Sequence, residues 1–269
     1  MADGVTPPDG SVTFVGNATV IIRYGGFTLL TDPNFLHKGQ HAYLGYGLRS
    51  RRLKEPALSV EQLPDLDAVV LSHLHDDHWD RVAERGLDRA LPVLTTEAAA
   101  RALDKRGFRG ARALRTWQHT EITKDGRRLR LTAMPGRHGP GPLRHLLPPV
   151  MGSLLEFGPR DAEPEFRLYI SGDTLMYEGL AEVARRHPEI DTGIVHLGGT
   201  RLLGVLTVTM DGRQGARWME TIPCRSVLPV HYDDYTVQKS PLSAFRTEVE
   251  RRGMSARLRH IDRGQTLTL

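Results

Sequence analysis

The sequence predicts an α/β fold in which two packed β-sheets carry helices on their outer faces. Short runs of β-branched and aromatic residues dominate the start of each half of the chain, and segments with helical spacing follow them. The chain has 269 residues, of which 39% are hydrophobic, so it can bury a substantial core. We find no internal repeat and no linker-like tract, and we expect a single domain over residues 1–269.

The first half predicts a meander of strands, a buried strand and two helices. Gly25-Gly26 separates two of the strands and is a typical hairpin turn. Thr95 or Thr96 can cap the second helix. We predict residues 34–56 as a loop, and a loop of this length is more often functional than idle. The predicted strands are Val12–Val15, Thr19–Arg23, Phe27–Thr31 and Ala68–Leu71, and the predicted helices are Trp79–Arg89 and Thr96–Lys105.

The second half also alternates strands and helices. Pro188 ends the first of its predicted helices, because proline cannot continue a helix. Strands and helices in both halves suit two sheets with helices outside. The predicted strands lie in Glu121–Ala133, Ser153–Phe157, Phe166–Ser171, Ile194–Leu197, Ser226–Val230 and Gln265–Leu269, and the predicted helices are Tyr177–Arg186, Gly212–Thr221 and Pro241–Arg252.

Composition excludes several classes of protein. Cys224 is the single cysteine, which rules out an internal disulfide framework and argues against a cysteine-based metal site. Residues 1–10 have neither the basic nor the apolar region of a signal peptide, and no apolar run spans a bilayer, so we expect a cytoplasmic protein. The net charge is +4, but the basic residues are spread along the chain. We therefore expect a small-molecule substrate, with an anionic one compatible with the charge, and no nucleic-acid partner; oligomerisation stays open.

Four candidate metal ligands follow the predicted strand Ala68–Leu71: His73, His75, Asp77 and His78. They lie on a loop at the C-terminal end of a strand, where α/β folds commonly bind ligands. Side chains two positions apart in an extended segment point the same way, so His73 and His75 can bind one ion. Asp77 and His78 come after the chain turns and can face a second ion. Imidazole and carboxylate ligands suit Zn²⁺, and also Mn²⁺ or Fe.

Two metal sites need more ligands than this motif contains, and three later segments offer them. His138, Asp173 and His231 each follow a predicted strand directly. Taken singly, each has a structural alternative: a turn histidine, an aspartate that caps a helix, and a buried polar histidine. Their shared position at strand ends favours metal ligation.

Together these motifs resemble those of the metallo-β-lactamase superfamily. The resemblance runs from Phe14-Val15-Gly16-Asn17-Ala18-Thr19 to His231 and implies a four-layer αββα sandwich. It also implies a ligand assignment. Carried over by position, His73, His75 and His138 would bind the first metal ion, Asp77, His78 and His231 the second, and Asp173 would bridge both.

Within the superfamily, the chain most resembles the branch of L-ascorbate-6-phosphate lactonase and N-acyl-phosphatidylethanolamine phospholipase D. The resemblance rests on Leu30-Thr31-Asp32-Pro33, Ser171-Gly172-Asp173-Thr174 and Thr209-Met210-Asp211. That branch commonly has Gly-His-Ala where this chain has Gly16-Asn17-Ala18, although Asn17 can still form a hydrogen bond near the site. Redox diiron members tend to have a carboxylate at the position of His75, so histidine there favours hydrolysis. Nuclease members usually carry a large inserted domain, for which this chain has no room.

These residues predict a dinuclear metal-dependent hydrolase that attacks a small ester, lactone or phosphodiester with a hydroxide shared by two divalent ions, Zn²⁺ first among the candidates. Asp77 can bind the second ion and orient the hydroxide. His196 can protonate a leaving group, and its alternative is a buried structural histidine. Asp32 can accept an N–H from a ligand histidine or form a simple Asp-Pro turn.

Substrate contacts are predicted next to these motifs. Tyr232 follows a candidate ligand and can line the pocket, and Arg49, Arg51 and Arg52 can hold a phosphorylated or lipid-like substrate or form a solvated basic loop. Two alternative functions remain at this point. One is a nucleic-acid-processing metallo-enzyme, and the other is an iron-dependent redox or non-catalytic metal-binding protein.

Overall fold

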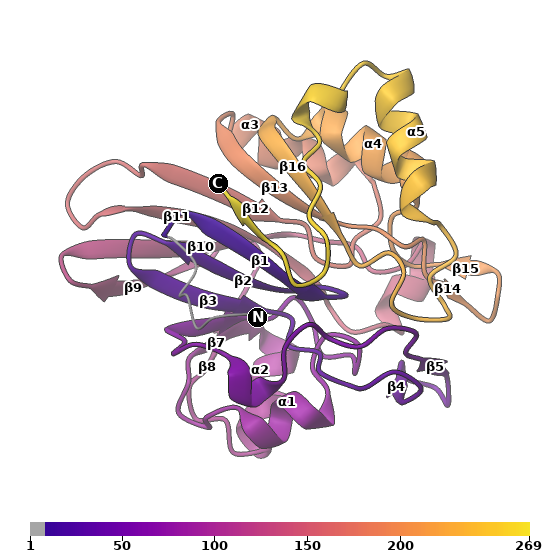
Figure 1. The fold of residues 1–269 in the computed structure, drawn as a ribbon, viewed down its shortest axis with the longest axis horizontal. Coiled ribbons are helices and arrows are strands. Elements are labelled where there is room, and N and C mark those ends of the chain that lie inside the picture. The colour runs from indigo at the N-terminus through magenta and orange to yellow at the C-terminus, as the bar shows by residue number, and fades with distance from the viewer. Residues whose placement is uncertain (1–8) are drawn as a thin grey trace.

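The computed structural model describes residues 9–269, apart from the side chain of Leu143. Residues 1–8, on which most of the expectation about a signal peptide rests, lie outside the described residues. Within residues 9–269, two sheets pack face to face and helices cover both outer faces (Figure 1). The predicted αββα sandwich is therefore confirmed.

The first sheet has seven strands among residues 9–269, in the order β17-β1-β2-β3-β6-β7-β8. The chain runs antiparallel from β1 through β2 to β3, and then parallel from β3 through β6, β7 and β8. As a result β1, β3 and β6 all end at the same edge of the sheet. The bounds are β1 (Ser11–Gly16), β2 (Thr19–Tyr24), β3 (Phe27–Thr31), β6 (Ala68–Val70), β7 (Val93–Thr96), β8 (Ala111–Leu114) and β17 (Thr266–Thr268).

The second sheet has six strands in the same described range, in the order β16-β13-β12-β11-β10-β9. Strands β12, β13 and β16 are parallel, and β10 runs in their direction because it is antiparallel to β11, which is antiparallel to β12. Four strands therefore end at one edge. The bounds are β9 (His119–Lys124), β10 (Arg127–Pro135), β11 (Met151–Pro159), β12 (Phe166–Ile170), β13 (Ile190–His196) and β16 (Cys224–Val230).

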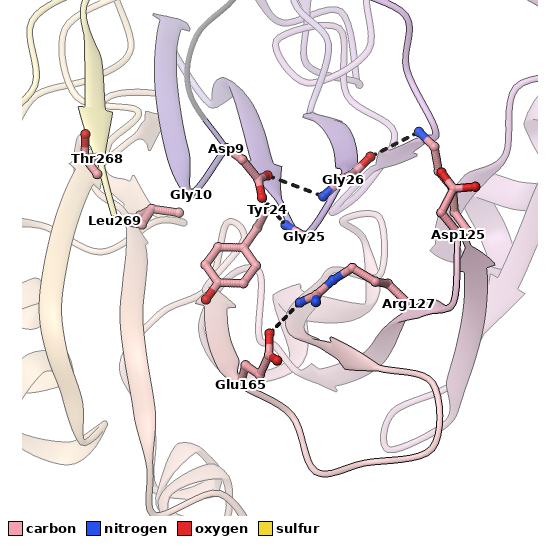
Figure 2. Close-up of a pocket in the computed structure, with 11 residues that line it drawn as sticks. Asp9, Gly10, Tyr24, Gly25, Gly26, Asp125, Arg127, Glu165, Thr268 and Leu269 are labelled. Atoms are coloured by element: carbon pink, nitrogen blue, oxygen red, sulfur yellow. Dashed lines mark hydrogen bonds and ion pairs between the residues drawn. The ribbon is translucent and has the colours of Figure 1, made fainter.

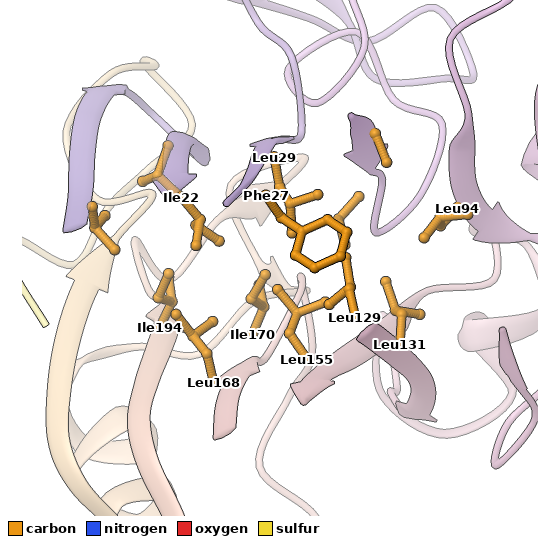
Figure 3. Packing of buried hydrophobic residues seen from close by; sticks show 14 of the residues in the cluster. Ile22, Phe27, Leu29, Leu94, Leu129, Leu131, Leu155, Leu168, Ile170 and Ile194 are labelled. Carbon is orange, nitrogen blue, oxygen red and sulfur yellow. The ribbon is translucent and has the colours of Figure 1, made fainter. Parts of the chain in front are cut away.

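A hydrophobic core fills the space between the sheets (Figure 3). Ile22, Phe27 and Leu29 from the first sheet face Leu155 and Leu168 from the second, and all five are fully buried. The period of two along each strand sends alternate residues into this core. Each such side chain contributes roughly 1.5–3 kcal/mol on burial, so this core holds the two halves of the chain together.

Helices form the outer layers of the sandwich. The first sheet is covered by α1 (Arg81–Gly86) and α2 (Glu97–Lys105), and the second by α3 (Ala181–Arg186), α4 (Gly212–Thr221) and α5 (Leu242–Arg251). Asp80 caps α1, and Thr96 caps α2 as one of the two predicted caps. Short 3₁₀ turns occur at Val60–Gln62, Gly141–His145, Glu178–Leu180 and Ser255–Arg257. None of the helices in residues 9–269 has the length and apolar character that crossing a bilayer requires.

Several segments differ from the sequence-based expectation. The predicted loop 34–56 contains a hairpin of β4 (His41–Tyr43) and β5 (Arg49–Arg51), and a second hairpin pairs β14 (Arg201–Leu202) with β15 (Leu206–Thr207). The β-rich stretch Glu121–Ala133 divides into β9 and β10 around a turn at residues 125 and 126. Strands β7 and β8 were not predicted, because each has only four residues and β8, with the sequence Ala-Arg-Ala-Leu, has neither a β-branched nor an aromatic residue.

Candidate metal centre

The seven predicted metal ligands meet where strands of both sheets end. The motif loop follows β6, while His138, Asp173 and His231 follow β10, β12 and β16. Parallel strands end at the same edge, so residues far apart in sequence are brought together. Six of the seven side chains belong to buried residues, and His75 is partly exposed.

The first group of candidate ligands contains His73, His75 and His138. Their ligand atoms lie within 4.8 Å of one another. His73 Nε2 is 3.0 Å from His75 Nδ1, and the His138 ring centroid lies 4.9 Å from that of His73 and 5.3 Å from that of His75. Three imidazoles that converge in this way are the donor set of a site for a divalent transition-metal ion.

The second group contains Asp77, His78, Asp173 and His231, again with ligand atoms within 4.8 Å of one another. His78 Nε2 lies 3.2 Å from Asp173 Oδ2 and 3.8 Å from Asp77 Oδ2. His231 Nε2 lies 3.4 Å from Asp77 Oδ2. Asp173 thus lies among the ligands of the second group, and His73 of the first group also lowers its pKa.

Unpartnered atoms in this centre indicate that it is built for cations. Asp77 Oδ1, His78 Nε2 and Asp173 Oδ1 are buried and have no hydrogen-bond partner among the described residues. A buried polar atom without a partner is costly, and three in one place call for a ligand. Imidazole nitrogens and carboxylate oxygens are hard-to-borderline donors, so the residues present fit divalent metal ions.

The protonation states differ between the two groups of candidate ligands. Burial, together with the neighbouring histidines, holds the pKa of His73 well below its usual value, and burial and His138 lower that of His75 to about 4. Burial alone would raise the pKa of Asp173, but His231 and His78 hold it well below its usual range. The first group therefore presents neutral imidazoles beside an ionised carboxylate, which is the state that binds metal. In the second group, Asp173 overcomes the effect of burial and raises the pKa of His78 and His231, so these imidazoles must lose a proton when a metal ion binds.

Asp32 orients the candidate ligand His78 through the ring nitrogen that faces away from the other candidate ligands. It lies at the end of β3, with a φ of 35°. Its Oδ1 accepts hydrogen bonds from Ser72 N (2.7 Å) and Ser72 Oγ (2.9 Å), and its Oδ2 lies 3.3 Å from His78 Nδ1. Burial would raise the pKa of Asp32, but His78 and His196 lower it to about 2, so it is a carboxylate. With Nδ1 protonated towards Asp32, His78 points Nε2 at Asp77 and Asp173 of the second group.

His196 lies behind the centre. Its side chain is fully buried, with Nε2 3.3 Å from Asp32 Oδ2 and Nδ1 3.3 Å from Ser171 Oγ. Both ring nitrogens therefore face protein groups. This placement favours a role in holding Asp32 over contact with a substrate.

Backbone carbonyls orient two other ligands. His138 Nδ1 lies 3.1 Å from the carbonyl oxygens of both Asp173 and Val208, and His231 Nδ1 lies 3.2 Å from Leu197 O. A ring nitrogen that donates to a carbonyl leaves the other nitrogen free for a metal. Sequence patterns contain no signal for these carbonyls, because any residue type has one.

Asn17 connects two parts of the centre. Its Nδ2 donates to Asp77 O (2.7 Å), and its carbonyl oxygen accepts from His231 N (2.8 Å). Gln238 Nε2 donates to Asn17 Oδ1 (3.0 Å). Asn17 has a φ of 52°, a left-handed conformation that asparagine tolerates better than most residues. It thus takes a structural place next to the centre, and Gln238, which the sequence analysis missed, supports it.

The remaining predicted residues lie further out. Tyr232 is largely buried in the helix-side core of the second sheet, and burial raises its pKa to about 12. Arg52 is fully buried: it donates to Asn34 O (3.0 Å) and pairs with Asp234 at 3.5 Å. Arg49 and Arg51 are exposed on β5. The basic loop therefore divides into one structural arginine and two solvent-facing ones.

A separate cavity of about 610 Å³ lies at the opposite ends of the strands (Figure 2). It is lined by the turns at Gly25 and Asp125 and by the C-terminal residues. Arg127 and Glu165 pair with each other there at 2.5 Å, and Asp9 accepts from Gly25 N at 3.0 Å. The described residues of its lining include no histidine, so they do not repeat the donor set of the metal centre.

Comparisons with known proteins agree with this geometry. A family model described as "Beta-lactamase superfamily domain" matches residues 28–232. UPF0173 protein YddR of Bacillus subtilis is 26% identical over 269 aligned residues, which cover 96% of this chain and 99% of that protein. A UPF0173 metal-dependent hydrolase of Deinococcus radiodurans is 26% identical, covering 75% of this chain and 80% of its own length.

Two further comparisons bear on the branch and the fold. N-acyl-phosphatidylethanolamine-hydrolyzing phospholipase D 1 of Caenorhabditis elegans is 26% identical over 135 residues, which cover 47% of this chain and 37% of that protein. The crystal structure of a possible metal-dependent hydrolase from Veillonella parvula superposes with a TM-score of 0.80 at 24% identity, covering 97% of this chain and 100% of that one. Because the family model matches most of the chain, this protein belongs to the β-lactamase superfamily, as its sequence motifs predicted.

Proposed function

We propose that this metal-dependent hydrolase of the metallo-β-lactamase superfamily uses two divalent metal ions to cleave a small ester, lactone or phosphodiester. The observation that carries the proposal is the convergence of two ligand groups around three buried polar atoms that have no hydrogen-bond partner among residues 9–269. Zn²⁺ is the first candidate, because three imidazoles and mixed imidazole–carboxylate sets are ligands that it favours. Mn²⁺ and Fe accept the same donors.

Each group of residues would take one ion. His73, His75 and His138 would hold the first, Asp77, His78 and His231 would hold the second, and Asp173 would bridge both. When bound, the ions would activate water at neutral pH and polarise the bond under attack. Asp77 keeps one buried oxygen unpartnered, so it can ligate through one oxygen and orient the attacking water through the other. No serine or cysteine nucleophile is required for this chemistry.

The surroundings of the centre would preserve its geometry during turnover. Asp32 holds His78, carbonyl oxygens hold His138 and His231, and Asn17 ties the Asp77 loop to the turn at His231. Metal centres depend on such outer partners for ligand orientation and affinity. We propose that His196 acts through Asp32, which leaves proton transfer to the leaving group for Asp77 or solvent.

The test combines activity and metal content. Purified metal-loaded protein is assayed on bis-p-nitrophenyl phosphate and on a panel of lactones and esters, which separates phosphodiesterase from lactonase or esterase activity. We expect His75→Ala and Asp173→Ala to abolish turnover and to lower the metal content, while circular dichroism shows a folded protein. His119→Ala, on the exposed edge strand β9, is the matched control and should behave like wild type. Wild-type activity in a metal-depleted His75 or Asp173 variant would falsify the two-metal assignment.

The alternatives from the sequence are tested with the same preparation. Iron together with a redox signal would favour the iron-dependent redox function, whereas two zinc or manganese ions per chain would contradict it. Salt-dependent binding to DNA or RNA would favour the nucleic-acid enzyme. The cytoplasmic location, the single domain and the oligomeric state stay predictions.

A further inference from the structure

Three segments without a single acidic residue surround the metal centre: residues 36–53, 139–150 and 199–208. We call them together the apolar–basic face. The first contains the β4–β5 hairpin, and Tyr43 N donates to Asp76 Oδ2 in the motif loop (2.9 Å). The second follows the candidate ligand His138 directly. The third ends at Val208, whose carbonyl oxygen lies 3.1 Å from His138 Nδ1.

The three segments form one surface, because a small hydrophobic cluster of their own holds them together. Leu44, Leu147 and Leu202, one from each segment, are buried in this cluster with Tyr235. Tyr46 Oη also donates to Leu146 O at 2.5 Å. The β4–β5 and β14–β15 hairpins project on the same side of the molecule, away from the sandwich (Figure 1). The exposed side chains of the three segments therefore lie beside one another on one surface.

Exposed hydrophobic side chains are concentrated on this face. All the large hydrophobic residues that are exposed within the described part of the chain belong to its three segments. Leu203 and Val205 lie at the turn of the β14–β15 hairpin and are 78% and 84% exposed. Large apolar side chains gathered on one face of a protein mark an interaction site. The others are Tyr43, Tyr46, Leu53 and Leu146.

The same face is positively charged. Arg49, Arg51, Arg144 and Arg201 are exposed, and none of them forms an ion pair with a described residue. Two acidic residues border the face, and both are already engaged: Asp76 accepts from the backbone of Tyr43, and Glu55 pairs with His37 and accepts from Lys38 N. Apolar tips surrounded by unpaired arginines and by tyrosine, an amphipathic ring that favours membrane interfaces, are the chemistry of a surface that enters an anionic lipid layer.

We propose that the apolar–basic face docks this protein onto an anionic lipid bilayer, with the metal centre facing the membrane. Leu203 and Val205 would enter the boundary between headgroups and acyl chains, and the arginines would contact lipid phosphates. A second copy of the chain is a poorer partner, because a two-fold interface would bring the unpaired arginines of both copies together. Docking does not depend on the identity of the substrate or of the metal.

The first experiment measures sedimentation of the full chain with vesicles. Binding is expected to vesicles of phosphatidylcholine and phosphatidylglycerol, to fall as salt is added, and to be weak on phosphatidylcholine alone. A basic residue near an anionic surface changes partitioning about five-fold, so Arg49→Gln with Arg51→Gln should weaken binding by about thirty-fold. The matched control, Arg109→Gln with Arg112→Gln, removes two exposed arginines at the edge of the first sheet and should bind like wild type.

A second measurement reports on insertion of the hairpin tip. Tryptophan fluorescence of Leu203→Trp should shift to shorter wavelength on anionic vesicles, whereas that of Arg109→Trp should not. Absence of sedimentation with anionic vesicles, or equal binding of the two double-arginine variants, would overturn the proposal. A blue shift of Leu203→Trp that appears without vesicles and grows with protein concentration would identify a second copy as the occupant and overturn it as well.

Discussion

Replacing Asp32 by asparagine keeps the shape of the side chain but changes what it offers to His78. The carboxylate accepts from Ser72 N and Ser72 Oγ through one oxygen, and faces His78 Nδ1 and His196 Nε2, each at 3.3 Å, through the other. Asparagine has one acceptor oxygen and one NH₂ group. If the oxygen stays with Ser72, the NH₂ group faces two imidazole nitrogens, and at least one of them must give up its proton.

The loss of that proton has a calculable effect on metal binding. His78 would carry its proton on Nε2, the atom that lies 3.2 Å from Asp173 Oδ2 and would otherwise bind the second ion. Removing an outer partner of a metal-binding histidine typically costs 10–100-fold in affinity, so we expect a loss of about that size for the second ion. The first ion, held by His73, His75 and His138, should be affected less.

Titration of the metal-free protein with Zn²⁺ against a chromophoric chelator measures both binding steps. Asp76→Asn is the matched control, because its carboxylate accepts from Tyr43 N at 2.9 Å, which an amide oxygen can also do. Its side chain forms no hydrogen bond with the candidate ligand histidines among the described residues. Wild-type affinity for both ions in Asp32→Asn would refute the role assigned to Asp32. An equal loss in Asp76→Asn would point to general damage of the motif loop.

The remaining predictions concern stability and access. In the metal-free protein, His78 and His196 overcome the effect of burial and lower the pKa of Asp32 from 3.8 to about 2. This carboxylate therefore contributes about 2 kcal/mol to the free energy of unfolding above about pH 4, and the contribution is lost as the pH falls through about 2. The difference in stability between wild type and Asp32→Asn, measured by urea unfolding, should shrink over the same pH range. Burial raises the pKa of Cys224 to about 12, so a thiol reagent at neutral pH should label it only after denaturation, and rapid labelling of native protein would contradict this. Gly172→Ala should destabilise the fold and reduce the metal content, because its φ is +62° and an added Cβ would lie 2.6 Å from a backbone oxygen. Gly204→Ala, with a φ of +74° and no atom near the added Cβ, should cost only about 1 kcal/mol of backbone strain. Thermal melts of the two variants measure the difference.

Much of the fold could be predicted because its signals are local. The period of two in β1 to β3, the turn at Gly25-Gly26 and the cap at Thr96 are encoded within a few residues, and the structure has these elements in the predicted places. Strand β8 was not predicted because its four residues include no β-branched or aromatic side chain and its conformation depends on pairing with β7. The β4–β5 hairpin was predicted as loop because its three-residue strands are stabilised by distant residues of the cluster around Leu44.

The candidate site also contains residues that the sequence could predict and residues that it could not. The spacing of His73, His75, Asp77 and His78 predicts a metal site without any knowledge of the fold, because neighbours in sequence must be neighbours in space. His138, Asp173 and His231 could be proposed as partners because each follows a strand. The roles of Arg52 and His196 could not be read in this way, since a side chain near a site in sequence can point into the protein, as both do.

The sequence by itself determined the motif at His73–His78, the order of strands and helices, and the chemistry of the donors, because these depend on residue type and short spacing. Only the tertiary structure decided that the ends of β1, β3, β6, β10, β12 and β16 share one edge of the sandwich, which brings Asn17, Asp32 and the seven candidate ligands together. It also decided that three acid-free segments form one exposed face beside them. The physical reason is that contacts between residues more than a hundred positions apart depend on strand direction and sheet packing, which the burial of the whole core sets.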